Sequence, residues 1–206
     1  ILALEASRAG GVVVGEDLGV VPAYVSKSLS EHGILGCAVE WFEQFDGVFR
    51  APKDWRQYAL ASVNTHDLPP AAGYLEYGHV KLREQLGLLS GPVEEFKKSA
   101  EAEHNAMLNM LVKEGYLDAD VLEDELANEN EIIDALYRGL KGSPCKLMAA
   151  SIVDAVGEKR TQNQPGTCNE YPNWRIPLAD GDGNVVPLEE LFCNTRLQEI
   201  AEIMRG

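Results

Sequence analysis

The chain has 206 residues, of which 45% are hydrophobic and 25% charged, an ordinary balance for a globular protein with one sizeable domain or two small ones. Eighteen basic and thirty-three acidic residues give a formal net charge of −15. Such a surface repels phosphate backbones and anionic lipids, so we expect neither a nucleic-acid partner nor a membrane partner.

The four cysteines (Cys37, Cys145, Cys168 and Cys193) are far apart and form no C-x-x-C pair. This spacing indicates neither a zinc site nor a disulfide framework and favours reduced thiols, so we expect a cytoplasmic protein. No apolar run approaches 18 residues, and no signal-peptide pattern is present.

The first predicted elements alternate between helices and strands. "ILALEASRAGG" is typical of the end of a helix closed by glycine, which suggests a piece of a longer protein. Residues 12–18 form an apolar run typical of a buried parallel strand, and residues 22–33 predict a helix. Further strands are predicted at 37–45 and 60–67, and this alternation indicates βαβ units with a parallel sheet.

The next stretch, residues 79–142, is predicted to be helical. A helix opens on Pro92 and ends at Gly115. One of its faces is predicted to pack into the core, through Val93, Phe96, Ala100, Met107 and Leu111.

The acid-rich residues 118–134 are interpreted as a solvated helix face, with a cation site as the alternative. Residues 146–157 fit either a buried helix or a fourth strand ending at Asp154, and a loop-rich tail follows. These changes of character divide the chain into 1–78, an inserted helical subdomain at 79–142, and 143–206.

Two acids, Glu16 and Asp67, each follow a predicted strand directly before a turn. Because side chains alternate along a strand, Glu16 and Asp17 point in opposite directions and only one can face a shared pocket. Glycoside hydrolysis uses two carboxyl groups brought together from different strands. One acts as an acid and another stabilises an oxocarbenium-like centre. Helix capping is the alternative role for Asp17 or Asp67.

Three stretches, "GEDLGVVPAYV", "WFEQFDGVFRAPKDWRQYALASVNTHDLPPAAGYLE" and "QNQPGTCNEYPNWR", follow one another in this order. Together they closely resemble the C-terminal half of 4-α-glucanotransferases, the amylomaltases or disproportionating enzymes of glycoside hydrolase family 77. The resemblance implies an α/β fold that is the C-terminal half, about strands 5–8, of a (β/α)₈ TIM barrel with an inserted helical segment. It also implies transfer of α-1,4-glucan segments between maltooligosaccharides by a retaining double displacement.

The resemblance carries four site residues onto this sequence. Glu16 matches the general acid/base, and Asp67 matches the aspartate that stabilises the transition state. His66 and Asn163 match positions that contact the bound glucan. Asp17 and Asn173 match motif residues, to which we assign structural roles. Neither a cofactor nor a metal is implied.

One part of the family pattern is missing from these 206 residues. A retaining enzyme needs a nucleophilic carboxylate about 5–5.5 Å from the acid/base. The family carries it in an R-x-D-H motif, and no R-x-D occurs here. We therefore expect an inactive fragment that binds the missing N-terminal half of the barrel or self-associates through its open sheet edges.

Several alternatives remain open. An amylase-type α-glucan hydrolase uses the same carboxylates, and a non-catalytic glucan- or protein-binding module uses none. Asp180, Asp182 and Asn184 have calcium-loop spacing, but Val185 and Leu191 occupy the places of the required glycine and glutamate, which favours a polar turn. The three tryptophans fit either the core or sugar stacking, and these are Trp41, Trp55 and Trp174.

Overall fold

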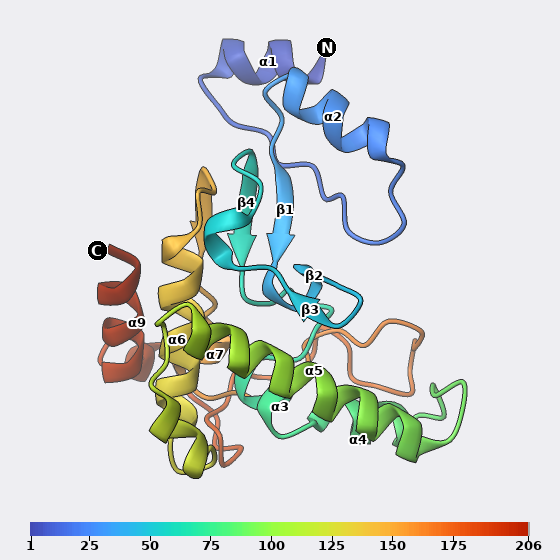
Figure 1. Cartoon of the computed structure of the whole chain (residues 1–206), viewed down its shortest axis with the longest axis vertical. Coiled ribbons are helices and arrows are strands. Elements are labelled where there is room, and N and C mark those ends of the chain that lie inside the picture. Colours follow the sequence, from blue (N-terminus) through green and yellow to red (C-terminus); the bar gives the residue numbers. More distant parts are fainter. Residues whose placement is uncertain (206) are drawn as a thin grey trace.

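The computed structural model describes residues 1–205, and within them a parallel sheet has the strand order β1-β4-β5. The strands are β1 (Gly36–Val39), β4 (Ala59–Ser62) and β5 (Leu147–Ala149). On the free side of β1, Val14 forms a parallel bridge with Leu35. Four parallel segments therefore lie side by side, and their carboxyl ends meet at one edge of the sheet (Figure 1).

The predicted strands exist, but each is shorter than the apolar run that predicted it. The run at 12–18 pairs only around Val14, and β1 ends at Val39, where a 3₁₀ turn, Glu40–Phe42, begins. Residues 44–49 then form an antiparallel hairpin of β2 (Gln44–Phe45) and β3 (Val48–Phe49). Asp46 and Gly47 in its loop both have positive φ, as tight hairpin turns require.

The ambiguous run at 146–157 contains both candidate structures. It forms β5 and then, after two residues, the short helix α7 (Ile152–Ala155). Asp154 therefore lies in a helix, so of the two alternatives the strand that ends at Asp154 was wrong. The acid-rich run is not one helix either, because a 3₁₀ turn at Ala119–Glu123 precedes α6, which begins only at Glu129.

Helices account for most of the remaining structure. The predicted N-terminal helix is α1, which is closed by Gly10 in the left-handed conformation. The helices, apart from α7, are α1 (Leu2–Ala9), α2 (Ala23–Glu31), α3 (Ala71–Leu75), α4 (Gly78–Gln85), α5 (Val93–Lys113), α6 (Glu129–Gly142), α8 (Leu188–Leu191) and α9 (Thr195–Arg205).

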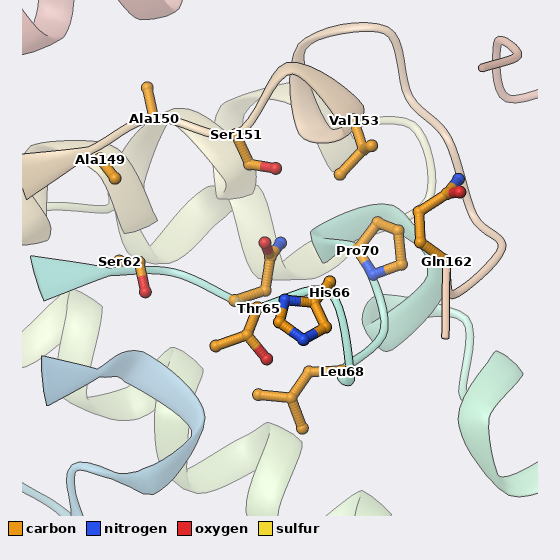
Figure 2. Close-up of a pocket in the computed structure, with 11 residues that line it drawn as sticks. Ser62, Thr65, His66, Leu68, Pro70, Ala149, Ala150, Ser151, Val153 and Gln162 are labelled. Atoms are coloured by element: carbon orange, nitrogen blue, oxygen red, sulfur yellow. The ribbon is translucent and has the colours of Figure 1, made fainter. Parts of the chain in front are cut away.

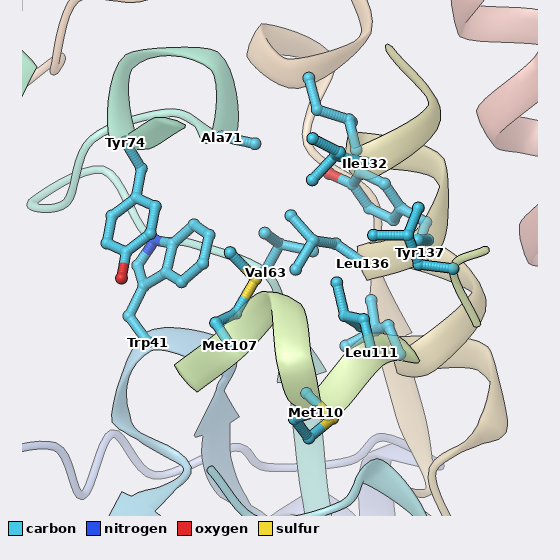
Figure 3. Close-up of a cluster of buried hydrophobic side chains, with 14 of the residues drawn as sticks. Trp41, Val63, Ala71, Tyr74, Met107, Met110, Leu111, Ile132, Leu136 and Tyr137 are labelled. Atoms are coloured by element: carbon cyan, nitrogen blue, oxygen red, sulfur yellow. The ribbon is translucent and has the colours of Figure 1, made fainter. Parts of the chain in front are cut away.

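The hydrophobic core lies between the sheet and the layer formed by α5 and α6, with α9 packed on α6 (Figure 1). Met107 and Leu111 are fully buried, as predicted, whereas Val93, Phe96 and Ala100 at the start of α5 are only half-buried. Figure 3 shows Met107 beside Trp41, which stacks on Tyr74, and Leu111 beside Leu136 and Tyr137 of α6. Burial of these groups fixes the layer against the carboxyl half of the sheet.

Candidate active site

Glu16 follows the N-terminal parallel segment directly. Leu35 N–H donates to the carbonyl of Val13 at 3.0 Å, and Gly15 N–H donates to the carbonyl of Leu35 at 2.7 Å. Glu16 lies one residue beyond this pairing and lines a cavity of about 480 Å³ that His66 and Asp67 also line. The predicted convergence of the two acids on one cavity is therefore present at the carboxyl edge of the sheet.

Asp17 points away from this cavity, as strand alternation predicted. Its carboxylate accepts two bonds from the Arg56 guanidinium, at 2.5 and 2.7 Å, and one from the Cys37 N–H at 2.9 Å. Ser26 donates a fourth at 3.2 Å. Although burial opposes its ionisation, these donors lower the pKa of Asp17 to about 2. Asp17 thus ties the segment that carries Glu16 to β1 and to the residues before β4.

A third acid at a strand end does not reach the cavity. Val39, the last residue of β1, lines the cavity, so the following Glu40 turns the other way. Its side chain is fully buried, and neither carboxylate oxygen is hydrogen-bonded within residues 1–205. Burial, together with the charge of Glu43, raises the pKa of Glu40 to about 8.

The loop after β4 is held by a buried carboxylate that the sequence analysis did not recognise. Both oxygens of Asp154 accept from the Asn64 amide at 2.9 Å, and the Ala71 N–H donates to the same carboxylate at 2.7 Å. The Tyr137 hydroxyl of α6 donates at 2.6 Å and itself accepts from the Ser151 N–H at 3.0 Å. The loop that carries His66 and Asp67 is therefore fastened at both ends.

Burial raises the pKa of Asp154, and its bonds to Tyr137, Ala71 and Asn64 act in the opposite direction. One signal in the sequence could have identified this residue. Like Glu16, Asp154 closes an apolar run, but the run ends in a short helix that turns its carboxylate inward. Asp154 is a positioning residue, since it contacts the loop and does not line the cavity.

Asn163 connects the predicted site residues to the C-terminal loop. Its side-chain amide donates to Asp67 Oδ1 at 2.6 Å, and its backbone N–H donates to the carbonyl of His66 at 3.0 Å. His66 Nε2 lies 3.4 Å from the same oxygen of Asp67. The four predicted site residues therefore lie close together: His66 and Asn163 contact Asp67, and Glu16 lines the same cavity as His66 and Asp67.

A second cavity, of about 300 Å³, adjoins the first and shares His66 with it. Figure 2 shows Thr65 and His66 on the loop after β4, with Ala149, Ala150 and Ser151 along the opposite side. His66 therefore stands between two hollows, with about half of its side chain exposed.

The three tryptophans have different environments. Trp41 and Trp55 are buried in the core, whereas Trp174 is exposed, with its ring centroid 4.9 Å from that of His66. Asn173 has the structural role assigned to it, because its carbonyl oxygen accepts from Gln164 N–H and its amide donates to Thr167, both at 2.8 Å.

Two other groups named by the sequence analysis have ordinary structural environments. Cys37 lines the larger cavity, but burial raises the pKa of its thiol, which makes it a poor nucleophile. Asp180 closes a polar turn, in which its Oδ1 accepts from the backbone N–H groups of Asp182 and Asn184. Within residues 1–205 no group of three or more His, Cys, Asp or Glu side chains is arranged to hold a metal ion.

The arrangement brings two carboxylates and an imidazole to one cavity, with the Asn163 amide bonded to one of the carboxylates. Such a set can exchange a proton with a bridging oxygen and hold hydroxyl groups beside a developing positive charge. It lacks a further carboxylate of the kind that an R-x-D-H motif would supply, since that motif does not occur in the sequence.

Comparisons with known proteins point to one family. The family model of 4-alpha-glucanotransferases, Glyco_hydro_77, matches residues 1–181. A 4-alpha-glucanotransferase of Mycobacterium tuberculosis is 49% identical over all of this chain, and one of Haemophilus influenzae is 32% identical over 96% of it. The chain spans only 29% and 28% of the length of these two relatives.

Solved structures agree with the sequence relatives. An amylomaltase from Corynebacterium glutamicum is 38% identical, with a TM-score of 0.91 over 98% of this chain and 30% of its own. An amylomaltase from Streptococcus agalactiae is 16% identical with a TM-score of 0.54, which shows a similar fold only. In the described part of the chain, no helix is both long enough and apolar enough to cross a membrane.

Proposed function

Because the chain belongs to the 4-alpha-glucanotransferase family, Glyco_hydro_77, we propose that it forms the acid/base-bearing part of an amylomaltase-like enzyme. The complete enzyme transfers α-1,4-glucan segments between maltooligosaccharides by a retaining double displacement. The observation that carries this proposal is the cavity shared by Glu16, His66 and Asp67.

Glu16 is the general acid/base. In the first half-reaction it protonates the bridging oxygen of an α-1,4 bond, so that the leaving segment departs as an alcohol. In the second it removes the proton from the 4-hydroxyl of an acceptor sugar, which attacks the glycosyl intermediate. Its position just beyond the pairing of Val14 supports this role, since Glu16 lines the cavity there.

Asp67 holds sugar hydroxyls and stabilises the oxocarbenium-like transition state. His66 hydrogen-bonds the same sugar, and Asn163 contacts the glucan while it orients Asp67. The bond from Asn163 to Asp67 Oδ1 supports this division, because it leaves the second oxygen of the carboxylate available for a sugar hydroxyl.

The nucleophile comes from outside these 206 residues, on an R-x-D-H segment of the barrel's N-terminal half. In this proposal the four parallel segments are about strands 5–8 of a (β/α)₈ barrel, and residues 79–142 are the inserted helical subdomain between residues 1–78 and 143–206. The edge residues beside Val14 and β5 then pair with the missing half or, in its absence, with another copy of the chain. Four free thiols support a cytoplasmic location.

A chimera tests the proposal directly. Residues 1–206 replace the aligned 30% of the Corynebacterium glutamicum amylomaltase, whose remainder supplies the other strands. We expect this chimera to convert maltotriose into glucose and longer maltodextrins, and we expect the isolated chain to do neither. Glu16→Gln in the chimera should lower kcat by at least about a thousandfold, because it removes the proton donor.

Glu5→Gln, on the exposed face of α1, is the matched control and should leave kcat unchanged. Robust turnover by the isolated chain would contradict the external nucleophile. If the chimera is active and Glu16→Gln leaves its kcat unchanged, Glu16 is not the acid/base. If reducing sugar is released without longer products, the enzyme is a hydrolase.

A further inference from the structure

The side chain of Trp174 is exposed, and its backbone adopts a conformation that tryptophan rarely takes. Its φ is +60°, in the left-handed region that glycine adopts readily and bulky side chains avoid. Its exposed fraction is 64%, whereas Trp41 and Trp55 are 4% and 3% exposed. Hydrophobic burial therefore does not explain why a tryptophan occupies this position.

The surrounding loop holds this conformation firmly. Trp174 N–H donates to the carbonyl of Gln162 at 3.0 Å, and Arg175 N–H donates to that of Pro172 at 3.0 Å. On the adjacent residue, the Asn173 side chain bonds Gln164 and Thr167. Backbone strain that the surrounding structure overdetermines is characteristic of functional positions.

The loop brings the indole to the proposed sugar site. The ring of Trp174 lies 4.9 Å from that of His66, centroid to centroid, with 44° between their planes. His66 lines both cavities, and Gln162, which anchors the backbone of Trp174, lines the smaller one. The indole is thus an apolar surface beside the polar groups that receive the glucan.

We propose that Trp174 is a stacking platform for one glucose ring of the bound α-glucan, next to the ring held by His66 and Asp67. This inference rests on the proposed function and adds a specificity-determining residue to it. The apolar face of a pyranose covers an aromatic ring well, and the indole offers the largest aromatic surface among the side chains. A flat platform at this point favours a linear chain of several glucose units over a single sugar.

Tryptophan fluorescence tests the proposal on the chain as it exists. Because Trp41 and Trp55 are buried, collisional quenching by acrylamide reports mainly on Trp174. We expect saturating maltoheptaose to lower the quenching constant of the accessible fraction at least about twofold, while glucose leaves it unchanged. Calorimetry with maltoheptaose on the same samples measures the affinity.

Trp174→Gly separates a binding role from a structural one. Glycine adopts φ +60° without strain, so the melting temperature should stay the same or rise. Maltoheptaose affinity should fall about tenfold, equivalent to about 1.4 kcal/mol. Trp174→Phe should recover part of the affinity, and Phe192→Ala, which removes another exposed aromatic ring, should leave the affinity unchanged.

Each outcome decides the proposal. Binding by the wild type without protection of Trp174, or equal affinity of Trp174→Gly, overturns the platform and leaves the proposed function intact. A melting temperature that falls in both Trp174→Gly and Trp174→Phe makes Trp174 a structural residue and also overturns it. Failure of the wild type to bind maltoheptaose at all counts against the platform and the proposed substrate class together.

Discussion

The two ends of the sheet differ in how firmly they are attached. We call residues 1–33 the N-terminal arm and the helices α5, α6 and α9 the helical layer. The arm carries Glu16, yet no residue of its two helices, α1 and α2, is buried. Both helices lie wholly within the part of the chain that the structure describes. Figure 1 places α1 and α2 at the opposite end of the molecule from α5.

The helical layer is the reverse case. α6 buries half of its residues, among them Ile132, Leu136 and Tyr137, and α5 adds Met107 and Leu111. The loop with His66 and Asp67 is fastened to this layer through Asp154 and Tyr137. One half of the candidate site therefore depends on the core of the chain, while the other depends on a short parallel pairing and the bonds of Asp17.

The largest expected effect is on the core side. Asp154→Ala leaves the Tyr137 hydroxyl, the Asn64 amide and the Ala71 N–H without their acceptor in a buried place. We expect a loss of about 3–5 kcal/mol in the free energy of unfolding, because three buried donors lose their common acceptor. Urea unfolding followed by circular dichroism measures it.

Asp120→Ala, an exposed acid outside this network, is the control and should change stability by less than about 0.5 kcal/mol. A similarly small effect for Asp154→Ala would mean that the loop does not depend on the helical layer.

Glu40→Gln should stabilise the same core, and increasingly so as the pH rises above about 4.5. Burial and Glu43 raise the pKa of Glu40 to about 8, above its value in the unfolded chain. The carboxyl group therefore does not weaken the fold below about pH 4.5, and its cost grows as the pH rises above that value until it is complete near pH 8. We expect Glu40→Gln to add about 3 kcal/mol at pH 9 and little at pH 4.

Denaturant unfolding at both pH values checks this prediction. Glu94→Gln, the same change at an exposed position of α5, serves as the control. A gain from Glu40→Gln that is equal at pH 4 and pH 9 would show that ionisation of this residue is not the cause.

Arg56→Met should have the smallest effect on the free energy of unfolding, and most of this effect should fall on the N-terminal arm. It removes the guanidinium from Asp17, whose side chain is 3% exposed, while keeping an apolar stem. We expect a loss of about 2 kcal/mol, mainly as faster hydrogen exchange in the arm, with α5 and α6 still protected.

Acid should release the arm in the same way. The pKa of Asp17 is lowered to about 2, so its contribution is present above its ordinary value of 3.8 and is lost as the pH falls through 2. Exchange in Arg56→Met should then no longer depend on this pH range. Equal loss of protection in the arm and in the helical layer would contradict the division between the two regions.

Local pattern was enough to predict much of this molecule. The alternation of helices and strands, the Gly10 cap and the helix at 93–113 follow from spacing and capping signals within a few residues. The alternation of side chains along a strand also predicted that Glu16 and Asp17 point in opposite directions, because this alternation does not depend on what the strand packs against. The roles of Glu16, Asp67, His66 and Asn163 remain predictions.

The errors have a common origin. The strands end earlier than their apolar runs because residues after Val39 and Ser62 continue into turns that are buried for other reasons. An apolar run reports burial and not extension, so residues 146–157 fitted a helix and a strand equally, and they form a short strand followed by a short helix.

The sequence by itself therefore determined the alternation of elements, the opposite directions of Glu16 and Asp17 and the family pattern, because these are properties of neighbours in the chain. Only the tertiary structure decided that Glu16 faces a cavity, that Glu40 is sealed in the core and that Asp154 holds a loop. Arg56 meets Asp17 across 39 residues, and Asp154 meets Ala71 across 83. The orientation and the pKa of a carboxylate depend on donors that are distant in the sequence, and local spacing does not predict them.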